Sequence, residues 1–169
     1  AVSTGNSTQF SASATGNAVA GRYSVQVLNT ARAQKLVSTA DFASGSDTVG
    51  AGTLTITVGS DSFELTTTAT TTLAELKTLI NDAAGNAGVS AALMVVARDP
   101  LDASAGTVAR LVLASDKTGA DNRIGISVSD TDSNGSDSLG LSRFYYSPAD
   151  PLNSQLAEHS AEGPEITAM

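Results

Sequence analysis

Residues 53–93, TLTITVGSDSFELTTTATTTLAELKTLINDAAGNAGVSAAL, contain one change of hydrophobic period, and that change decides the fold. Apolar and polar residues alternate over 53–58 and again over 62–66, with Gly59-Ser60-Asp61 between them. Alternation places successive side chains on opposite faces of a strand, and Gly, Ser and Asp are typical turn residues. Residues 53–66 are therefore predicted to form a β-hairpin.

From Thr72 onward the apolar residues recur every three or four positions, which is the spacing of one helical face. The residues of this apolar stripe are Leu73, Leu76, Leu79, Ile80 and Ala83. Thr72 and Glu75 have the spacing of a capping box, and Gly85 stands where a left-handed C-terminal cap is needed. The pattern predicts a short helix that is stable only when its stripe packs on a sheet.

Further strands are predicted on both sides of this hairpin and helix. Residues 22–28 alternate and continue irregularly towards Leu36 and Val37, and apolar or alternating runs follow at 89–97, 108–114 and 123–129. The segments between them are rich in Gly, Asp, Asn and Pro, the residues of turns. The expected fold class is α+β and β-rich, with mainly antiparallel sheets and one short helix packed on the sheet.

The composition excludes several classes of function. Of the 169 residues, 15% are charged, against about 25% in an average soluble protein. Small and β-branched residues take their place, with 27 Ala, 22 Ser and 20 Thr. Only nine basic residues and a net charge of −8 argue against binding a phosphate backbone. The chain has no Cys, so disulfides, zinc-thiolate sites and thiol nucleophiles are excluded. This composition is typical of a secreted or surface-assembly protein.

Acidic residues are concentrated at the end of the chain. Residues 1–129 have a net charge of −2, whereas residues 130–169 have one basic and seven acidic residues, a net charge of −6. A domain boundary is therefore expected near residue 130. Beyond it we expect a polar loop over 130–141, a short strand or packing anchor at 143–146, and a helix over 152–161 that ends at Gly163-Pro164.

Few segments have the residues of a chemical site. The loop from Asp130 to Asp137 imitates the first half of a calcium loop, but its twelfth position is Leu141 instead of the bidentate Glu. His159 is expected to be a surface histidine, because no nucleophile elbow accompanies it. Gly50-Ala51-Gly52 precedes a predicted strand, so it suits a hairpin entry better than a phosphate loop, which follows a strand.

Two Asn-x-Ser/Thr triplets, at Asn6 and Asn134, are glycosylation acceptors only if the chain passes through a secretory pathway. The sequence shows neither a signal peptide nor an apolar run long enough to span a membrane. No catalytic, cofactor-binding or metal-binding residue is predicted, so we expect a protein that is not an enzyme and has no cofactor.

Two stretches taken together resemble a known family. GRYSVQV at residues 21–27 and AQKL at 33–36 resemble the strand and Ala-Gln element that open the second domain of bacterial flagellar filament cap proteins, the hook-associated protein 2 family. Residues 53–129 are similar to the flagellin hook IN module, whose name comes from the pair found here as Ile80-Asn81. Hook IN modules also occur inside flagellins, and the preceding Tyr-x-Val strand favours the cap.

Three segments are expected along the chain. Residues 1–45 correspond to the strands that open the second cap domain, and 46–129 to the hook IN module. Residues 130–169 are an acidic polar segment outside the resemblance whose domain assignment is open, with an inserted outer domain as one alternative. The family's helical terminal regions are absent, and the chain begins without Met, so we expect an excised middle piece of a longer protein.

The resemblance also implies a structural function. Cap subunits form a homo-oligomeric ring at the extracellular tip of the flagellum, where they promote the folding and polymerisation of exported flagellin, and in some bacteria the cap contacts host mucus. The expected partners are therefore further copies of the chain, flagellin and, secondarily, a host surface. Two alternatives stay open: the surface domain of a flagellin, and a calcium-dependent adhesin or carbohydrate-binding module that uses the loop from Asp130 to Asp137.

Overall fold

The computed structural model describes residues 13–19, 21–22, 31–130 and 135–159. The chain divides into two compact units, Ala1–Thr30 and Ala31–Met169. In the first unit a turn is closed by the backbone N–H of Ala18, which donates to the carbonyl oxygen of Thr15 at 3.0 Å. The strand predicted over 22–28 falls almost entirely outside the described residues and stays a prediction.

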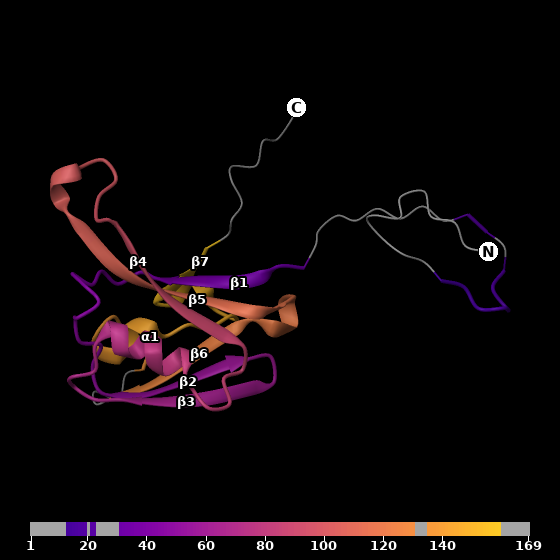
Figure 1. The fold of residues 1–169 in the computed structure, drawn as a ribbon, viewed down its shortest axis with the longest axis horizontal. Coiled ribbons are helices and arrows are strands. Elements are labelled where there is room, and N and C mark those ends of the chain that lie inside the picture. The colour runs from indigo at the N-terminus through magenta and orange to yellow at the C-terminus, as the bar shows by residue number, and fades with distance from the viewer. Residues whose placement is uncertain (1–12, 20, 23–30, 131–134, 160–169) are drawn as a thin grey trace. The chain divides into compact units, whose positions relative to one another are not determined.

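The second unit contains two antiparallel sheets (Figure 1). The four-stranded sheet has the order β4-β5-β1-β7 and the three-stranded sheet the order β3-β2-β6. The strands are β1 (Ala33–Ser38), β2 (Gly52–Val58), β3 (Asp61–Thr67), β4 (Val89–Ala97), β5 (Thr107–Thr118), β6 (Ile124–Asp130) and β7 (Leu156–Glu158). The two-sheet, single-helix architecture confirms the predicted α+β, β-rich class.

The predicted hairpin is confirmed as β2 and β3. These strands pair in unbroken register from Gly52 opposite Thr67 to Val58 opposite Asp61. On its other side β2 pairs with β6, which makes it the central strand of its sheet. Its alternate residues Leu54, Ile56 and Val58 are at most 2% exposed, so the period-2 pattern of the sequence is the buried face of this strand.

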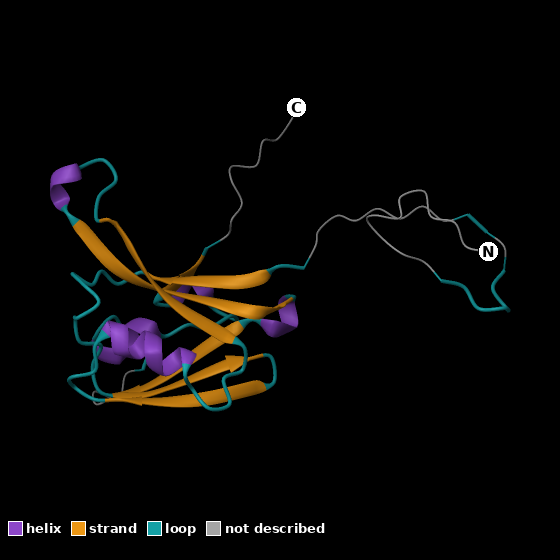
Figure 2. Ribbon diagram, in the orientation of Figure 1, coloured by secondary structure: helices purple, strands orange, loops and turns teal. Residues whose placement is uncertain are grey.

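The predicted helix forms as α1 (Leu73–Asn81), and its capping box is complete. The Thr72 hydroxyl accepts from the backbone N–H of Glu75 at 3.2 Å, and the Glu75 carboxylate accepts from the backbone N–H of Thr72 at 2.8 Å. Leu73, Leu76 and Ile80 are buried. The helix contacts β4 of one sheet and β3 of the other, as Figures 1 and 2 show.

Two details predicted for this helix were wrong. Leu79 is 39% exposed, because Leu73, Leu76 and Ile80 already cover the helix face that meets the sheets. The helix ends at Asn81 with Asp82 as its cap, and Gly85 lies in the following turn. A glycine cap is unnecessary here, because the side-chain amide of Asn86 donates to the terminal carbonyl oxygen of Ile80 at 2.8 Å.

The end of the described chain packs on the same unit, so the change in charge near residue 130 does not mark a structural boundary. Leu141, Phe144, Tyr146 and Leu156 are each at most 1% exposed and belong to one hydrophobic core with residues of both sheets and α1. This burial confirms residues 143–146 as a packing anchor. β1, from the first predicted segment, pairs with β5 of the second, and the division of the chain into three segments stays a prediction.

The helix predicted over 152–161 was wrong. A 3₁₀ turn, η4 (Pro151–Asn153), is followed by the strand β7, which pairs with β1 from Leu36 opposite Glu158 to Ser38 opposite Leu156. The reason is tertiary: β1 offers a free edge, and pairing with it satisfies backbone groups that a short isolated helix would leave exposed. The segment before it forms η3 (Gly140–Phe144).

The hairpin of β4 and β5 extends beyond the sheets as an arm that ends in η1 (Ala103–Ala105), visible at the upper left of Figure 2. A short 3₁₀ turn, η2 (Ala120–Asn122), connects β5 to β6. At the base of the arm, Phe42 stacks on Phe144 with ring centroids 5.8 Å apart, and the guanidinium of Arg143 lies 4.4 Å from the Phe42 ring centroid. This stack connects the chain after β1 to the segment after β6.

Candidate interaction surfaces

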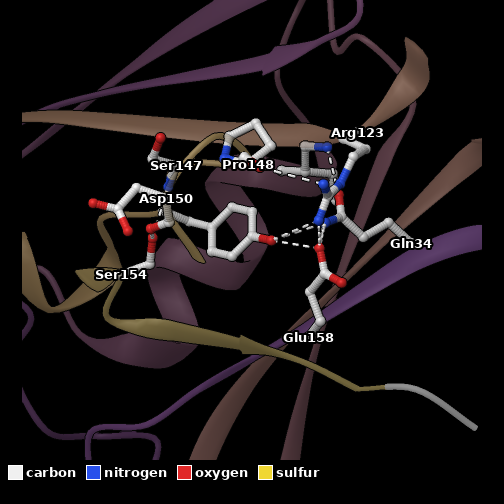
Figure 3. A network of polar contacts seen from close by, with 9 residues as sticks. Gln34, Arg123, Ser147, Pro148, Asp150, Ser154 and Glu158 are labelled. Carbon is white, nitrogen blue, oxygen red and sulfur yellow. Dashed lines mark hydrogen bonds and ion pairs between the residues drawn. The ribbon is translucent and has the colours of Figure 1, made fainter. Parts of the chain in front are cut away.

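A polar network joins the two sheets at the end of the described chain (Figure 3). It consists of Gln34 from β1, Arg123 just before β6, Tyr146, and Glu158 from β7. The Gln34 amide nitrogen donates to Glu158 Oε1 at 2.6 Å and to the Tyr146 hydroxyl at 3.1 Å, and its oxygen accepts from the backbone N–H of Ile124 at 2.6 Å. We call these four side chains the Tyr146 network.

The network is balanced in charge. Arg123 pairs with Glu158 and also donates to the carbonyl oxygen of Pro148 at 3.2 Å. The Tyr146 hydroxyl donates to Glu158 Oε1 at 2.5 Å. Burial raises the pKa of the Tyr146 hydroxyl, and the charge of Arg123 and the hydrogen bond from Gln34 partly oppose that rise. Because three members bond to Glu158 Oε1, this network connects the two sheets.

Sequence periodicity carries no signal for this network. Gln34 and Glu158 are 124 positions apart, and Arg123 and Tyr146 are 23 positions apart. Gln34, Arg123 and Glu158, each taken alone, have the character of solvated polar side chains. Only the pairing of β7 with β1 brings the four together.

Two asparagine side chains close part of the outer edge of β4. The Asn81 amide donates to the carbonyl oxygen of Ala91 at 2.9 Å and accepts from its backbone N–H at 2.8 Å. The Asn86 amide donates to the carbonyl oxygens of Ile80 and Val89, both at 2.8 Å, and accepts from the N–H groups of Gly88 and Val89. In both cases a side-chain amide takes the place that a neighbouring strand would occupy.

The arm of β4 and β5 presents exposed apolar side chains. Val95 is 67% exposed, Met94 38%, and Leu101 near the tip 97%. Apolar side chains gathered on one projection are typical of a contact surface. The sequence shows this stretch only as a continuous apolar run, which is equally typical of a fully buried strand.

Two shallow hollows lie on the described surface. One is lined mainly by threonines beside α1, including Thr71 and Thr78. The other lies between the β2–β3 turn and β5, where Lys117 donates to Asp61 at 2.8 Å and thereby lowers the pKa of that carboxyl. Neither places a nucleophile beside a base in the way that catalysis by a side chain requires.

The residues singled out in the sequence do not converge on one site. His159 is exposed, as predicted, and its backbone N–H donates to the carbonyl oxygen of Lys35. Gly50 and Gly52 lead into β2, which confirms the hairpin-entry interpretation. Within 31–130 and 135–159, no three His, Cys, Asp or Glu side chains are grouped as metal ligands.

The proposed calcium loop lies partly outside the described residues, which omit 131–134. Of its two ends, Asp130 Oδ2 accepts from the Ser142 hydroxyl at 2.7 Å, and Asp137 Oδ1 accepts from the backbone N–H of Leu139 at 2.9 Å. The triplets at Asn6 and Asn134 begin outside the described residues too. Among the described helices, none is long and apolar enough to cross a membrane.

Comparison with known proteins identifies a motif in the centre of the chain. Residues 53–117 match the flagellin hook IN motif. This range runs from β2 through α1 to near the end of β5, and it includes Asn81 and Asn86 with the strand edge that they close. The matched segment is therefore the part of the fold in which the hydrophobic period changes.

Relatives match over most of the chain. The B-type flagellar hook-associated protein 2 of Pseudomonas aeruginosa is 36% identical over 140 residues, which is 82% of this chain and 27% of that protein. The chain thus spans about a quarter of the length of this curated relative.

Two solved structures share the fold. The D2-D3 domains of the flagellar cap protein FliD from Escherichia coli match with a TM-score of 0.63 and 27% identity, over 87% of this chain and 69% of that one. FliD (HAP2) from Pseudomonas aeruginosa PAO1 matches with a TM-score of 0.58 and 32% identity, over 87% and 62%. The chain therefore belongs to the flagellar hook-associated protein 2 family and contains a flagellin hook IN motif.

Proposed function

We propose that this chain is a structural module of a bacterial flagellar filament cap, located at the extracellular filament tip, whose full-length protein promotes flagellin folding and polymerisation. The observation that carries the proposal is the joint match in sequence and fold: similarity to a flagellar hook-associated protein 2 over 82% of the chain, and to cap-protein D2-D3 domains over 87%. The partners proposed for the full-length protein are further copies of itself, in a ring, and flagellin.

The way the fold is stabilised supports this proposal. A protein exported as an unfolded chain has to fold after export, and a chain without Cys cannot be trapped by crosslinks on the way. Packing and hydrogen bonds hold the described unit together instead: two antiparallel sheets share one core, and the Tyr146 network joins them. A unit of this kind suits a rigid plate that presents polar strand faces.

The experiment compares two neighbouring residues of β3 within the full-length protein. Phe63 is buried at 6% exposure, whereas the adjacent Ser62 points outward. Cells that lack their own cap protein receive the wild-type protein, Phe63→Asp or Ser62→Asp, and flagellin is measured in filaments and in the medium. We expect filaments with the wild type and Ser62→Asp, and unpolymerised flagellin in the medium with Phe63→Asp, because a buried carboxylate disrupts the module. Normal filaments with an exported Phe63→Asp protein would contradict the proposal.

The flagellin alternative rests on the hook IN motif alone, which flagellins share, whereas the relatives reported above are cap proteins over a much longer match. The adhesin alternative depends on calcium. Thermal unfolding with and without calcium tests it: a clear rise in melting temperature that Asp132→Ala abolishes would favour an adhesin over a cap module. Contact with host mucus is the remaining, secondary proposal for the full-length protein.

A further inference from the structure

The hydrogen bonds of β4 alternate between its two sides. The backbone N–H of Asp116 donates to the carbonyl oxygen of Gly88, and the backbone N–H of Arg98 donates to that of Gly106, just beyond the two ends of the β4–β5 pairing. In an antiparallel pair the hydrogen-bonded positions alternate with positions whose backbone groups point away from the neighbour. The even-numbered residues of β4 therefore bond to β5, and the odd-numbered residues 89, 91, 93, 95 and 97 direct their N–H and C=O groups outward.

The first part of this edge is closed. Asn86 occupies both backbone groups of Val89, and Asn81 occupies both backbone groups of Ala91. These contacts agree with the alternation, because the two asparagines bond to odd-numbered residues only. Strand pairing at 89 and 91 would have to displace two side-chain amides.

The second part is open. No hydrogen bond from the described residues reaches the outward groups of Leu93, Val95 or Ala97. Natural edge strands are protected by lysine, proline, a bulge or an inward charge. Residues 89–97, VSAALMVVA, have no charge and no proline, and they pair with β5 in unbroken register. Val95 at the centre of the open part is 67% exposed. We call residues 93–97 the open edge.

We propose that the open edge pairs antiparallel with the open edge of a second copy of this chain, about a twofold axis at Val95. In this register Val95 lies opposite Val95 of the second copy, and Leu93 lies opposite Ala97. Every outward residue then faces an outward residue, so three hydrogen-bonded pairs form, each of which exchanges two N–H···O bonds. An edge that complements itself in this way fits a second copy of the same chain, and the contact is isologous.

The length of the open edge fits this pairing. Residue 99 of one copy would lie opposite Ala91 of the other, where Asn81 already closes the edge. The strand ends at Ala97, and Asp99 and Pro100 belong to the following turn, so the chain leaves before it reaches that amide. The pairing therefore covers the open edge without displacing the asparagines, and it places the two Val95 side chains side by side.

Electrostatics give this contact an identifiable salt dependence. The paired segments are uncharged, whereas each chain carries a net charge of −8. Screening weakens the repulsion between two acidic chains, so added salt should tighten the dimer. The proposal does not depend on the cap ring, which would require head-to-tail contacts instead of isologous ones.

Sedimentation analysis of the 169-residue chain tests the pairing. We expect a concentration-dependent monomer–dimer equilibrium that Val95→Lys weakens about tenfold or more, because it places like charges directly opposite each other. Leu101→Lys is the matched control: it adds the same charge at the exposed arm tip, away from the open edge, and should leave the equilibrium unchanged. A chain that stays monomeric at high concentration and high salt overturns the proposal, as does a dimer unaffected by Val95→Lys.

Cysteine crosslinking tests the register. Because the chain has no Cys, a single introduced thiol reports one contact. Residues directly opposite in a hydrogen-bonded pair have Cα atoms about 5.5 Å apart, within the range a disulfide spans. Val95→Cys should therefore form a disulfide dimer under mild oxidation, whereas Ala97→Cys alone should not. An equal mixture of Leu93→Cys and Ala97→Cys chains should form the heterodimer. Crosslinking of Ala97→Cys as fast as Val95→Cys would refute the register.

Discussion

Replacement of Asn86 tests how much its side-chain amide contributes at the end of the helix, where the backbone N–H of Asp82 also donates to the carbonyl oxygen of Thr78. The Asn86 amide uses its full hydrogen-bonding capacity, with two donated and two accepted bonds at 2.8–2.9 Å. Its partners belong to the last turn of α1, at Ile80, and to the start of β4, at Gly88 and Val89. The side chain thus connects helix and strand across the loop that separates them.

The expected cost follows from the number of bonds. A protein hydrogen bond contributes about 1 kcal/mol net, and Asn86 is half-buried, so water replaces part of what Asn86→Ala removes. We expect Asn86→Ala to lower the free energy of unfolding by about 3 kcal/mol, which corresponds to a fall of roughly 10 °C in melting temperature for a domain of this size.

Asn122→Ala provides the matched control. The Asn122 amide makes one side-chain hydrogen bond, to the carbonyl oxygen of Thr118 at 2.8 Å, in an exposed turn. Its loss should cost about 0.5–1 kcal/mol. Asn86→Asp adds a second comparison, because the carboxylate keeps both accepted bonds but faces the carbonyl oxygens of Ile80 and Val89 with no donor. It should be at least as destabilising as Asn86→Ala at neutral pH.

The assay is chemical unfolding of the purified chain, followed by circular dichroism and fitted at a common slope. The reasoning is refuted if Asn86→Ala and Asn122→Ala cost the same within 0.5 kcal/mol, which is the usual scatter for surface substitutions. It is also refuted if Asn86→Asp is as stable as the wild type, because that result would mean that the two donated bonds contribute nothing.

Three further outcomes are expected. Thr72→Ala should lower the free energy of unfolding by about 1 kcal/mol, since it removes one half of the capping box with Glu75; unchanged stability in a denaturant titration would count against that box. Phe42→Ala should cost about 3–5 kcal/mol, because Phe42 is 1% exposed and stacked on Phe144, and a loss below 1 kcal/mol in the same titration would be inconsistent with that packing. Burial raises the pKa of Tyr146, so the stability contributed by its neutral hydroxyl is fully present below the ordinary tyrosine pKa and is lost as pH rises through the folded-state pKa. Tyr146→Phe should flatten this alkaline loss of stability. An unchanged dependence of the unfolding free energy on pH would argue against a role of Tyr146 in that loss.

Secondary-structure elements could be predicted where the pattern of neighbouring residues alone indicates which side of the element is buried or how it is capped. The alternation over 53–66 indicates a strand pair because the two residues of the pleat face opposite sides, and the Thr72–Glu75 spacing indicates the helix start because both capping bonds lie within four residues. By contrast, the local pattern indicates a helix cap at Gly85, since nothing local shows that Asn86 reaches back to Ile80.

The sequence by itself determined the order and type of the central elements, the absence of thiol chemistry and the resemblance to a flagellar family, because each depends on residues close together in the chain or on composition. Tertiary structure decided the rest. It made residues 156–158 a strand, because β1 offers a free edge, and it assembled the Tyr146 network from residues as many as 124 positions apart. It also divided β4 into a closed half and an open half. The packing of α1 brings Asn81 to Ala91, whereas residues 93–97, at the edge of their sheet, have no neighbouring strand on that side among the described residues.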